Sequence, residues 1–120
     1  MLSLRLSSLT KFVNYNDKII DIGCDHALLD IFLVKSDLVK SIIASDINVQ
    51  ALNSGIKNIE NEGLSDKISA RLGDGLNVLT DKDNIDTVII SGMGTNTIIG
   101  ILNNDHLKDI NKLIIQSLSL

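Results

Sequence analysis

Short runs rich in isoleucine and valine alternate along this chain with segments of helical periodicity, and no other feature constrains its fold as strongly. Five such runs are expected to be strands, at residues 18–23, 41–46, 67–72, 86–91 and 112–116. Apolar residues recur three or four positions apart in the segments between them, at 27–35, 49–62, 76–80 and 95–103. Strands that alternate with helices favour right-handed crossovers and a parallel sheet. The sequence therefore predicts an α/β fold with a Rossmann-like doubly wound parallel sheet.

The chain is expected to begin with a helix and to form a single domain. Leu2, Leu6, Leu9 and Val13 are spaced as one face of an amphipathic helix. Gly63, directly after the segment 49–62, is the expected left-handed residue that ends a helix. No proline or low-complexity linker interrupts the 120 residues, so we expect one domain over 1–120.

Composition limits the cellular context and the partners. The single cysteine, Cys24, cannot form an internal disulfide and has no nearby ligands for a metal, which fits a reducing, cytoplasmic compartment. No apolar run reaches the length of a membrane span. The net charge of −4, with lysine and arginine scattered singly, means that a nucleic-acid partner would need a local basic face. The sequence does not indicate an oligomeric state.

Ligands of open parallel sheets bind beyond the carboxyl ends of the strands, so the residues directly after each strand are the candidates for a binding site. The first strand leads into Asp21-Ile-Gly-Cys-Asp-His26, where Gly23 allows a ligand to approach the backbone. This loop lacks the three glycines of the dinucleotide fingerprint, which argues against a nicotinamide-dependent oxidoreductase. A ligand without a pyrophosphate fits the loop better.

The ends of the next three strands indicate a nucleoside pocket. Asp46 follows Gly23 by 23 residues, close to the spacing at which an acidic residue binds ribose hydroxyls in nucleotide-binding folds. The third strand ends in Gly73-Asp-Gly75, and the fourth in Ser91-Gly-Met-Gly94, which we expect to be a flexible loop. Each motif alone is also ordinary turn or cap chemistry, and Met93 is as readily a packing residue. Their combination favours the pocket.

Together these motifs resemble the bacterial tRNA (adenine-22-N1)-methyltransferases, class I enzymes that use S-adenosylmethionine. The resemblance extends from about Leu2 to Gln116, and the first loop carries its most specific motif. The matching segments are Leu4-Arg-Leu6, Asp21-Ile-Gly-Cys-Asp-His-Ala27, Ala44-Ser-Asp46, Gly63-Leu-Ser-Asp-Lys-Ile68, Arg71-Leu-Gly-Asp-Gly75 and Ser91-Gly-Met-Gly94.

The resemblance implies a role for each matching residue. The loop around Gly23 would hold the methionine part of the cofactor, Asp46 the ribose hydroxyls and Asp74 the adenine amine, while Gly92 and Met93 would close the pocket near the sulfonium. The full set implied to bind cofactor is Arg5, Asp21, Gly23, Asp46, Ile47, Gly73, Asp74, Gly75, Gly92 and Met93. Asp25 and His26 are the candidate catalytic residues, although a lone histidine such as His26 is more often a residue that starts a helix or packs against its neighbours than a catalyst. No metal is expected.

The sequence departs from the family pattern inside the chain and at its end. Thr95 stands where the family usually has a glycine, and Leu29 and Asp30 replace an aromatic-proline pair. The family continues beyond Gln116 into further sheet and a helical domain, so we expect a C-terminally truncated enzyme that lacks part of the target-base pocket and of the tRNA surface. The alternatives are a non-catalytic or decayed cofactor-binding remnant and a methyltransferase with a substrate other than tRNA.

Overall fold

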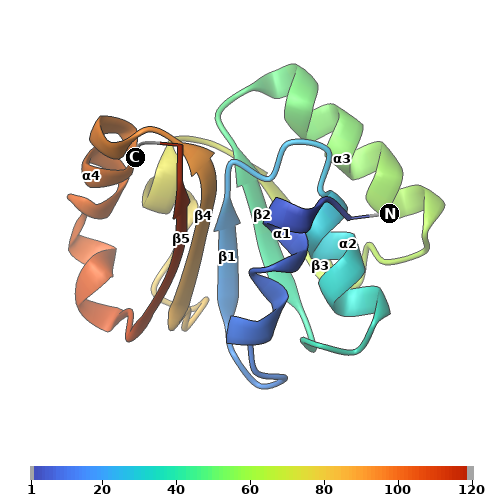
Figure 1. The fold of residues 1–120 in the computed structure, drawn as a ribbon. Helices are drawn as coiled ribbons and strands as arrows, with labels where there is room; N and C mark the ends of the chain where they lie inside the picture. The colour runs from blue at the N-terminus through green and yellow to red at the C-terminus, as the bar shows by residue number, and fades with distance from the viewer. Residues whose placement is uncertain (1, 119–120) are drawn as a thin grey trace.

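A computed structural model describes residues 2–118 and contains one sheet of five parallel strands (Figure 1). The strands are β1 (Ile19–Ile22), β2 (Ile42–Asp46), β3 (Ile68–Leu72), β4 (Thr87–Met93) and β5 (Lys112–Ser117). Their order across the sheet is β3-β2-β1-β4-β5, so the strand order reverses between β1 and β4. The predicted Rossmann-like parallel fold is confirmed. Its switch point lies beside β1, where a ligand of such a sheet binds.

Helical elements cover both faces of the sheet (Figure 1). One face packs against α1 (Leu4–Ser7), α2 (Leu28–Lys35) and α3 (Val49–Asn61), and the other against α4 (Thr95–Leu102) and the 3-10 turns Gly75–Val78 and Asp105–Asp109. Successive residues of β1 alternate between the two cores, with Ile19 in the first and Ile20 in the second. Because both faces are covered, every residue of β1 is buried.

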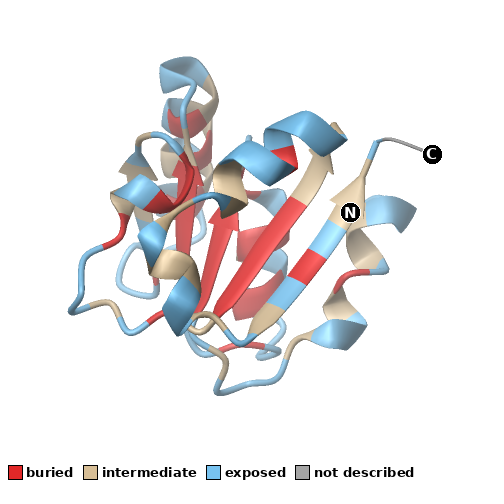
Figure 2. Ribbon diagram, turned by 90° about the vertical axis from the view of Figure 1, so that its left-hand side faces the viewer, coloured by how far each residue is buried: buried red, intermediate tan, exposed pale blue. Residues whose placement is uncertain are grey.

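The inner strands are thus buried along most of their length, whereas β5 lies at an edge of the sheet. Figure 2 shows buried residues along the inner strands and an alternation of exposed and buried residues along β5. Leu113 and Ile115 are exposed there, and Ile114 between them is buried. Among residues 2–118, no helix is long and apolar enough to cross a membrane.

Helix α3 confirms the helix predicted at 49–62, because its cap, its apolar face and its end all lie where the sequence places them. The Asn48 side chain caps its first turn by accepting a hydrogen bond from the Ala51 amide at 2.9 Å. Leu52 and Ile59 face the core from one side of the helix. The helix stops before Gly63, which has the expected positive φ of 69°.

The predicted helix at the N-terminus is wrong as a continuous element. It is divided into α1 and a separate 3-10 turn, Thr10–Phe12. The hydroxyl groups of Ser7, Ser8 and Thr10 donate hydrogen bonds to backbone carbonyls three residues earlier. Such side-chain bonds compete with regular helix geometry, and they were not visible in the spacing of the leucines.

Two further expectations need correction. The segment 76–80 is a short 3-10 turn rather than an α-helix. Ser91–Met93, expected to be a flexible loop, continues β4 and pairs with β5 through a bulge, with Gly92 at a positive φ of 72°. A bulge next to a site re-aims a side chain without ending the strand pairing. It places Met93 over the ends of the central strands.

Candidate functional site

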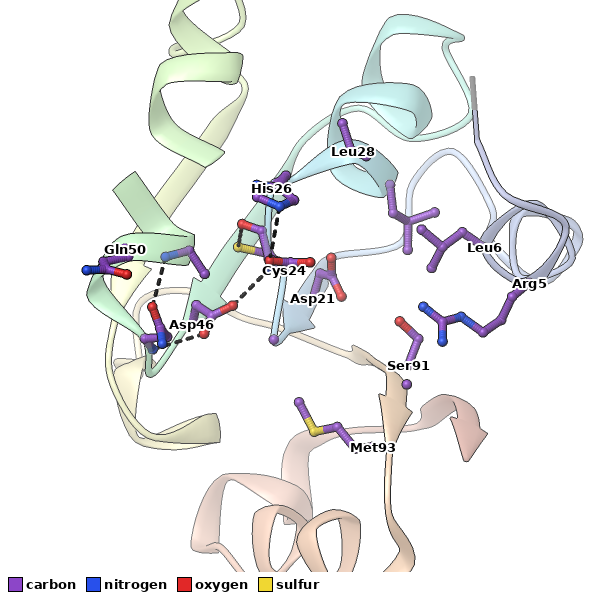
Figure 3. A pocket seen from close by; sticks show the side chains of 16 residues that line it. Arg5, Leu6, Asp21, Cys24, His26, Leu28, Asp46, Gln50, Ser91 and Met93 are labelled. Carbon is purple, nitrogen blue, oxygen red and sulfur yellow. Dashed lines mark hydrogen bonds and ion pairs between the residues drawn. The ribbon is translucent and has the colours of Figure 1, made fainter. Parts of the chain in front are cut away.

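A cavity of about 620 Å³ opens at the carboxyl ends of β1, β2 and β4. Its size suits a ligand of nucleoside dimensions or larger. Of the site residues predicted from the sequence, it brings together Arg5, Asp21, Gly23, Asp25, His26, Asp46, Gly92 and Met93. These residues come from α1, the loop after β1, the end of β2 and the bulge of β4, as Figure 3 shows for the labelled side chains.

Four predicted residues do not line this cavity: Ile47, Gly73, Asp74 and Gly75. Ile47 is an exposed apolar side chain that follows Asp46 directly. The Gly73 amide donates a hydrogen bond to the Asp46 carbonyl at 3.0 Å, so this turn adjoins the cavity at its β2 end. The four residues therefore extend the same edge of the sheet.

Sequence reasoning missed several residues that line the cavity. Asn48, Gln50 and Ala51 enter it from the start of α3, and Leu6, Leu28 and Ser91 from α1, α2 and β4. The first three could have been found, because the first turn of a helix that follows a strand end must lie near that end. The others depend on how α1 and α2 pack, which the sequence pattern does not fix.

Gly23 brings the backbone close to the cavity. Its φ is +76°, and a Cβ atom there would lie 2.4 Å from the Met93 Cε atom. The amides of Gly23 and Cys24 both donate to the Ser45 carbonyl, at 2.9 and 2.8 Å, which ties this turn to β2. A side chain at position 23 would therefore meet both conformational strain and the Met93 methyl group.

The Asp46 carboxylate is held in place by backbone donors. Its Oδ2 accepts from the Asp25 amide at 2.9 Å, and its Oδ1 accepts from the Asn48 amide at 3.0 Å (Figure 3). An ionised carboxylate can accept about four hydrogen bonds, so two of these positions stay open for ligand donors. A fixed carboxylate at the end of the second strand suits a pair of neighbouring hydroxyl groups.

Asp25 and His26 stand at the rim of the cavity. Their side chains are 70% and 53% exposed, and His26 Nε2 lies 3.7 Å from Asp25 Oδ1. The other ring nitrogen, Nδ1, lies 2.7 Å from Ser54 Oγ. Asp25 has a positive φ of 53°, which is a strained conformation for this residue. The hydrogen bond that its backbone amide donates to the Asp46 carboxylate helps to hold it there. Both groups are accessible to a large substrate.

Two buried carboxyl groups lie beside one another beneath the cavity. Asp21 on β1 is 2% exposed, and Asp30 on α2 is 0% exposed. Burial raises the pKa of Asp21 to about 6, and Asp46 adds to this rise while the bond with Asp30 opposes it. Burial, together with the charge of Asp21, raises the pKa of Asp30 well above its usual range. Burial also raises the pKa of the adjacent Cys24 thiol.

The cavity combines a cation with acidic groups. Arg5 extends from α1 toward Asp21 and Ser91 (Figure 3), and a Cβ on Gly92 would lie 3.4 Å from its Nη1 atom. Within residues 2–118, no hydrogen bond or ion pair engages this guanidinium. A cation and a carboxylate in one cavity match a ligand with both a carboxylate and an ammonium group. Asp46 adds acceptors for hydroxyl groups, so the arrangement suits a nucleoside that carries an amino-acid moiety.

Comparison with known protein families agrees with this geometry. A family described as a methyltransferase domain matches residues 2–119. The chain belongs to this methyltransferase family. Among curated proteins, this methyltransferase domain is 35% identical over 117 residues to the tRNA (adenine(22)-N(1))-methyltransferase of Bacillus subtilis. The match covers 96% of this chain and 49% of the relative.

Solved structures of similar proteins also match this chain. TrmK of M. capricolum in complex with S-adenosyl-homocysteine is 43% identical, with a TM-score of 0.93 over 100% of this chain and 54% of that one. Streptococcus pneumoniae Sp1610 in complex with S-adenosyl-L-methionine is 36% identical, with a TM-score of 0.90 over 98% of this chain and 56% of that one. The resemblance seen in the motifs is confirmed. The methyltransferase domain spans about half the length of these relatives.

Proposed function

We propose that residues 1–120 form a domain that binds S-adenosylmethionine and transfers its methyl group to N1 of an adenine in tRNA. The observation that carries the proposal is the cavity that holds Arg5, Asp21 and Asp46 around the close approach at Gly23. Similarity to the adenine-22 methyltransferase of Bacillus subtilis supports adenine 22 as the target. A tRNA-modifying enzyme of bacteria would act in the cytoplasm.

The residues present fit this cofactor. Arg5 would pair with its carboxylate and Asp21 with its ammonium group, since Asp21 Oδ1 is buried and has no donor among the described residues. Asp46 would accept from the ribose hydroxyls, through the positions that the backbone leaves open. Ile47 and the turn Gly73-Asp74-Gly75 would contact the adenine at the adjoining edge of the sheet.

The protein's contribution to transfer would be alignment and exclusion of water. When bound, S-adenosylmethionine supplies an electrophilic methyl group on its sulfonium. Adenine N1 has a free lone pair, so no residue has to remove a proton from it. Met93 and Gly92 lie where they would close the cavity over the reacting atoms. The target base would have to leave the tRNA stack to reach them.

Asp25 and His26 would act on the target base. At the rim of the cavity, the Asp25 carboxylate could accept a hydrogen bond from the exocyclic amine of adenine and stabilise the positive charge that develops on the ring. Ser54 holds the His26 ring beside it. Asp25→Asn should therefore lower turnover with little change in cofactor affinity, whereas an equal loss of both would assign Asp25 to cofactor binding.

The first test is calorimetric titration of the chain with S-adenosylmethionine and S-adenosylhomocysteine. Asp46→Ala should abolish binding, and Asp109→Ala, at an exposed aspartate in a separate cavity, should leave it unchanged. A methyl-transfer assay on unmodified tRNA follows, with protein and small-molecule acceptors in parallel. Transfer to one of these acceptors alone would assign a different substrate, and binding without any transfer would favour a non-catalytic module. A folded sample that binds neither nucleoside would refute the proposal.

A further inference from the structure

The buried carboxyl groups of Asp21 and Asp30 have no conventional partner. Among residues 2–118, Asp21 Oδ1 and both carboxyl oxygens of Asp30 lack a hydrogen-bond donor. Buried carboxylates are normally paired with a cation or with several donors, because an unpaired charge is costly away from water. Here the side chains of Asp21 and Asp30 lie within hydrogen-bonding reach of one another.

Two adjacent carboxyl groups can satisfy one another only if one of them holds a proton. Two negative charges this close and this deeply buried repel strongly, so the pair retains one proton that a single, exposed aspartic acid would lose. The protonated group then donates a hydrogen bond to the ionised one. This arrangement gives the ionised carboxyl a donor and leaves the other carboxyl neutral, so that it carries no buried charge that needs a partner.

The position of each residue decides where the proton lies. Asp21 lines the cavity, whereas Asp30 lies behind it on α2 and does not. The other charged or titratable groups that line the cavity are Arg5 on α1, Cys24, Asp25 and His26 in the loop after β1, and Asp46 at the end of β2. Arg5 and any ligand cation favour the ionised form of the carboxyl that faces the cavity, which is Asp21. Asp30 lies in the first turn of α2, where a backbone hydrogen bond lowers its pKa, but burial and the charge of Asp21 outweigh this effect.

We propose that Asp30 carries a proton at neutral pH and donates a hydrogen bond to Asp21, which stays ionised and accepts the ammonium group of an amino-acid ligand. Asp30 is thus a positioning residue for the cofactor rather than a catalytic one. The identity of the ligand rests on the proposed function, but the shared proton does not. The sequence did not indicate this role, since Asp30 is a single polar residue within the apolar segment 27–35.

The shared proton is tested without ligand. Carbon-13 NMR of the aspartate carboxyl groups, assigned with Asp21→Asn and Asp30→Asn, should show Asp30 protonated at pH 7.5 and Asp21 titrating near 6. An ionised Asp30 at pH 7.5 would overturn the proposal. Because no cofactor is present, this result is independent of whether the protein is a methyltransferase.

Binding of S-adenosylhomocysteine between pH 5 and 8 tests the consequence. Its affinity should fall as the pH drops through about 6, where Asp21 gains a proton. Binding of 5′-methylthioadenosine, which lacks the amino-acid part, should not change over the same range. If the affinity for both ligands declined in parallel, Asp21 would not be the group that binds the ammonium group. If neither ligand bound at any pH, the proposed function would be refuted. The NMR experiment alone would then determine whether Asp21 and Asp30 share a proton.

Two substitutions of similar size separate positioning from packing. Asp30→Asn keeps a donor for Asp21, and its affinity for S-adenosylhomocysteine at pH 7.5 should stay within about threefold of the unmodified chain. Asp30→Leu removes the donor, so its affinity should fall at least about tenfold, as expected for one lost hydrogen bond to a charged group. The pH at which affinity declines should also move upward in Asp30→Leu. Equal losses in both variants would contradict the proposal.

Discussion

Gly23→Ala tests how closely the backbone must approach the cavity. The backbone at position 23 has a φ of +76°, and a left-handed conformation costs an L-residue about 1–2 kcal/mol. The new Cβ would lie 2.4 Å from Met93 Cε, well inside the roughly 3.5–4.0 Å at which carbon atoms pack. The Met93 methyl must therefore move by about 1 Å or more, at a further cost of about 1 kcal/mol for a strained rotamer. We expect Gly23→Ala to lower the free energy of unfolding by about 2–3 kcal/mol in total.

Gly63→Ala is the matched control for this experiment. Gly63 has a similar φ of +69°, but a Cβ there meets nothing within 4 Å. Urea unfolding should therefore show a loss of about 1–2 kcal/mol for Gly63→Ala, from backbone strain alone. Calorimetric titration with S-adenosylhomocysteine should show normal affinity for Gly63→Ala and at least about tenfold weaker affinity for Gly23→Ala, because Met93 is displaced within the cavity.

The double variant Gly23→Ala/Met93→Ala separates strain from the clash with Met93. It should be more stable than the sum of the two single changes predicts. Removing the Met93 side chain relieves the clash with the new Cβ, and the new Cβ in turn fills part of the space that Met93 leaves. A Gly23→Ala variant that is no less stable than Gly63→Ala, or that binds S-adenosylhomocysteine as tightly as the unmodified chain, would contradict a close approach between position 23 and Met93.

Further predictions concern the titratable groups. Because burial raises the pKa values of Asp21 and Asp30, the folded chain holds more protons than the unfolded one above about pH 4. Thermal unfolding should therefore show stability that declines as the pH rises through about 6, with a smaller decline in Asp30→Asn. Arg71 donates two hydrogen bonds to Asp83, at 2.7 and 2.8 Å, and holds the pKa of that carboxyl far below its usual range. Asp83→Asn should cost about 1–2 kcal/mol at pH 7, and urea unfolding should show this difference shrinking as the pH falls below about 4. Burial raises the pKa of the Cys24 thiol, so mass spectrometry should show iodoacetamide modifying the native chain at pH 8 at least about tenfold more slowly than the unfolded one.

Most of the fold could be predicted from the sequence because its signals are local. The runs of β-branched residues and the helical spacing between them depend on neighbours within a few positions, and the parallel direction of the strands then follows from the general rule of right-handed crossovers. The same rules placed Gly23 and Asp46 at one edge, since the carboxyl ends of parallel strands meet there. The opening helix was one exception, because the hydrogen bonds donated by the Ser7, Ser8 and Thr10 hydroxyl groups divide it.

The sequence by itself determined the class of fold and the edge of the sheet at which a ligand would bind. Only the tertiary structure decided which side chains meet at that edge. Met93 reaches Gly23 because a bulge in β4 turns it over the end of β1, and Asp30 reaches Asp21 because α2 packs on β2 and β3 with Asp30 in its first turn. Both contacts depend on strand register and helix packing, which are set by the whole core. No local pattern could have encoded them.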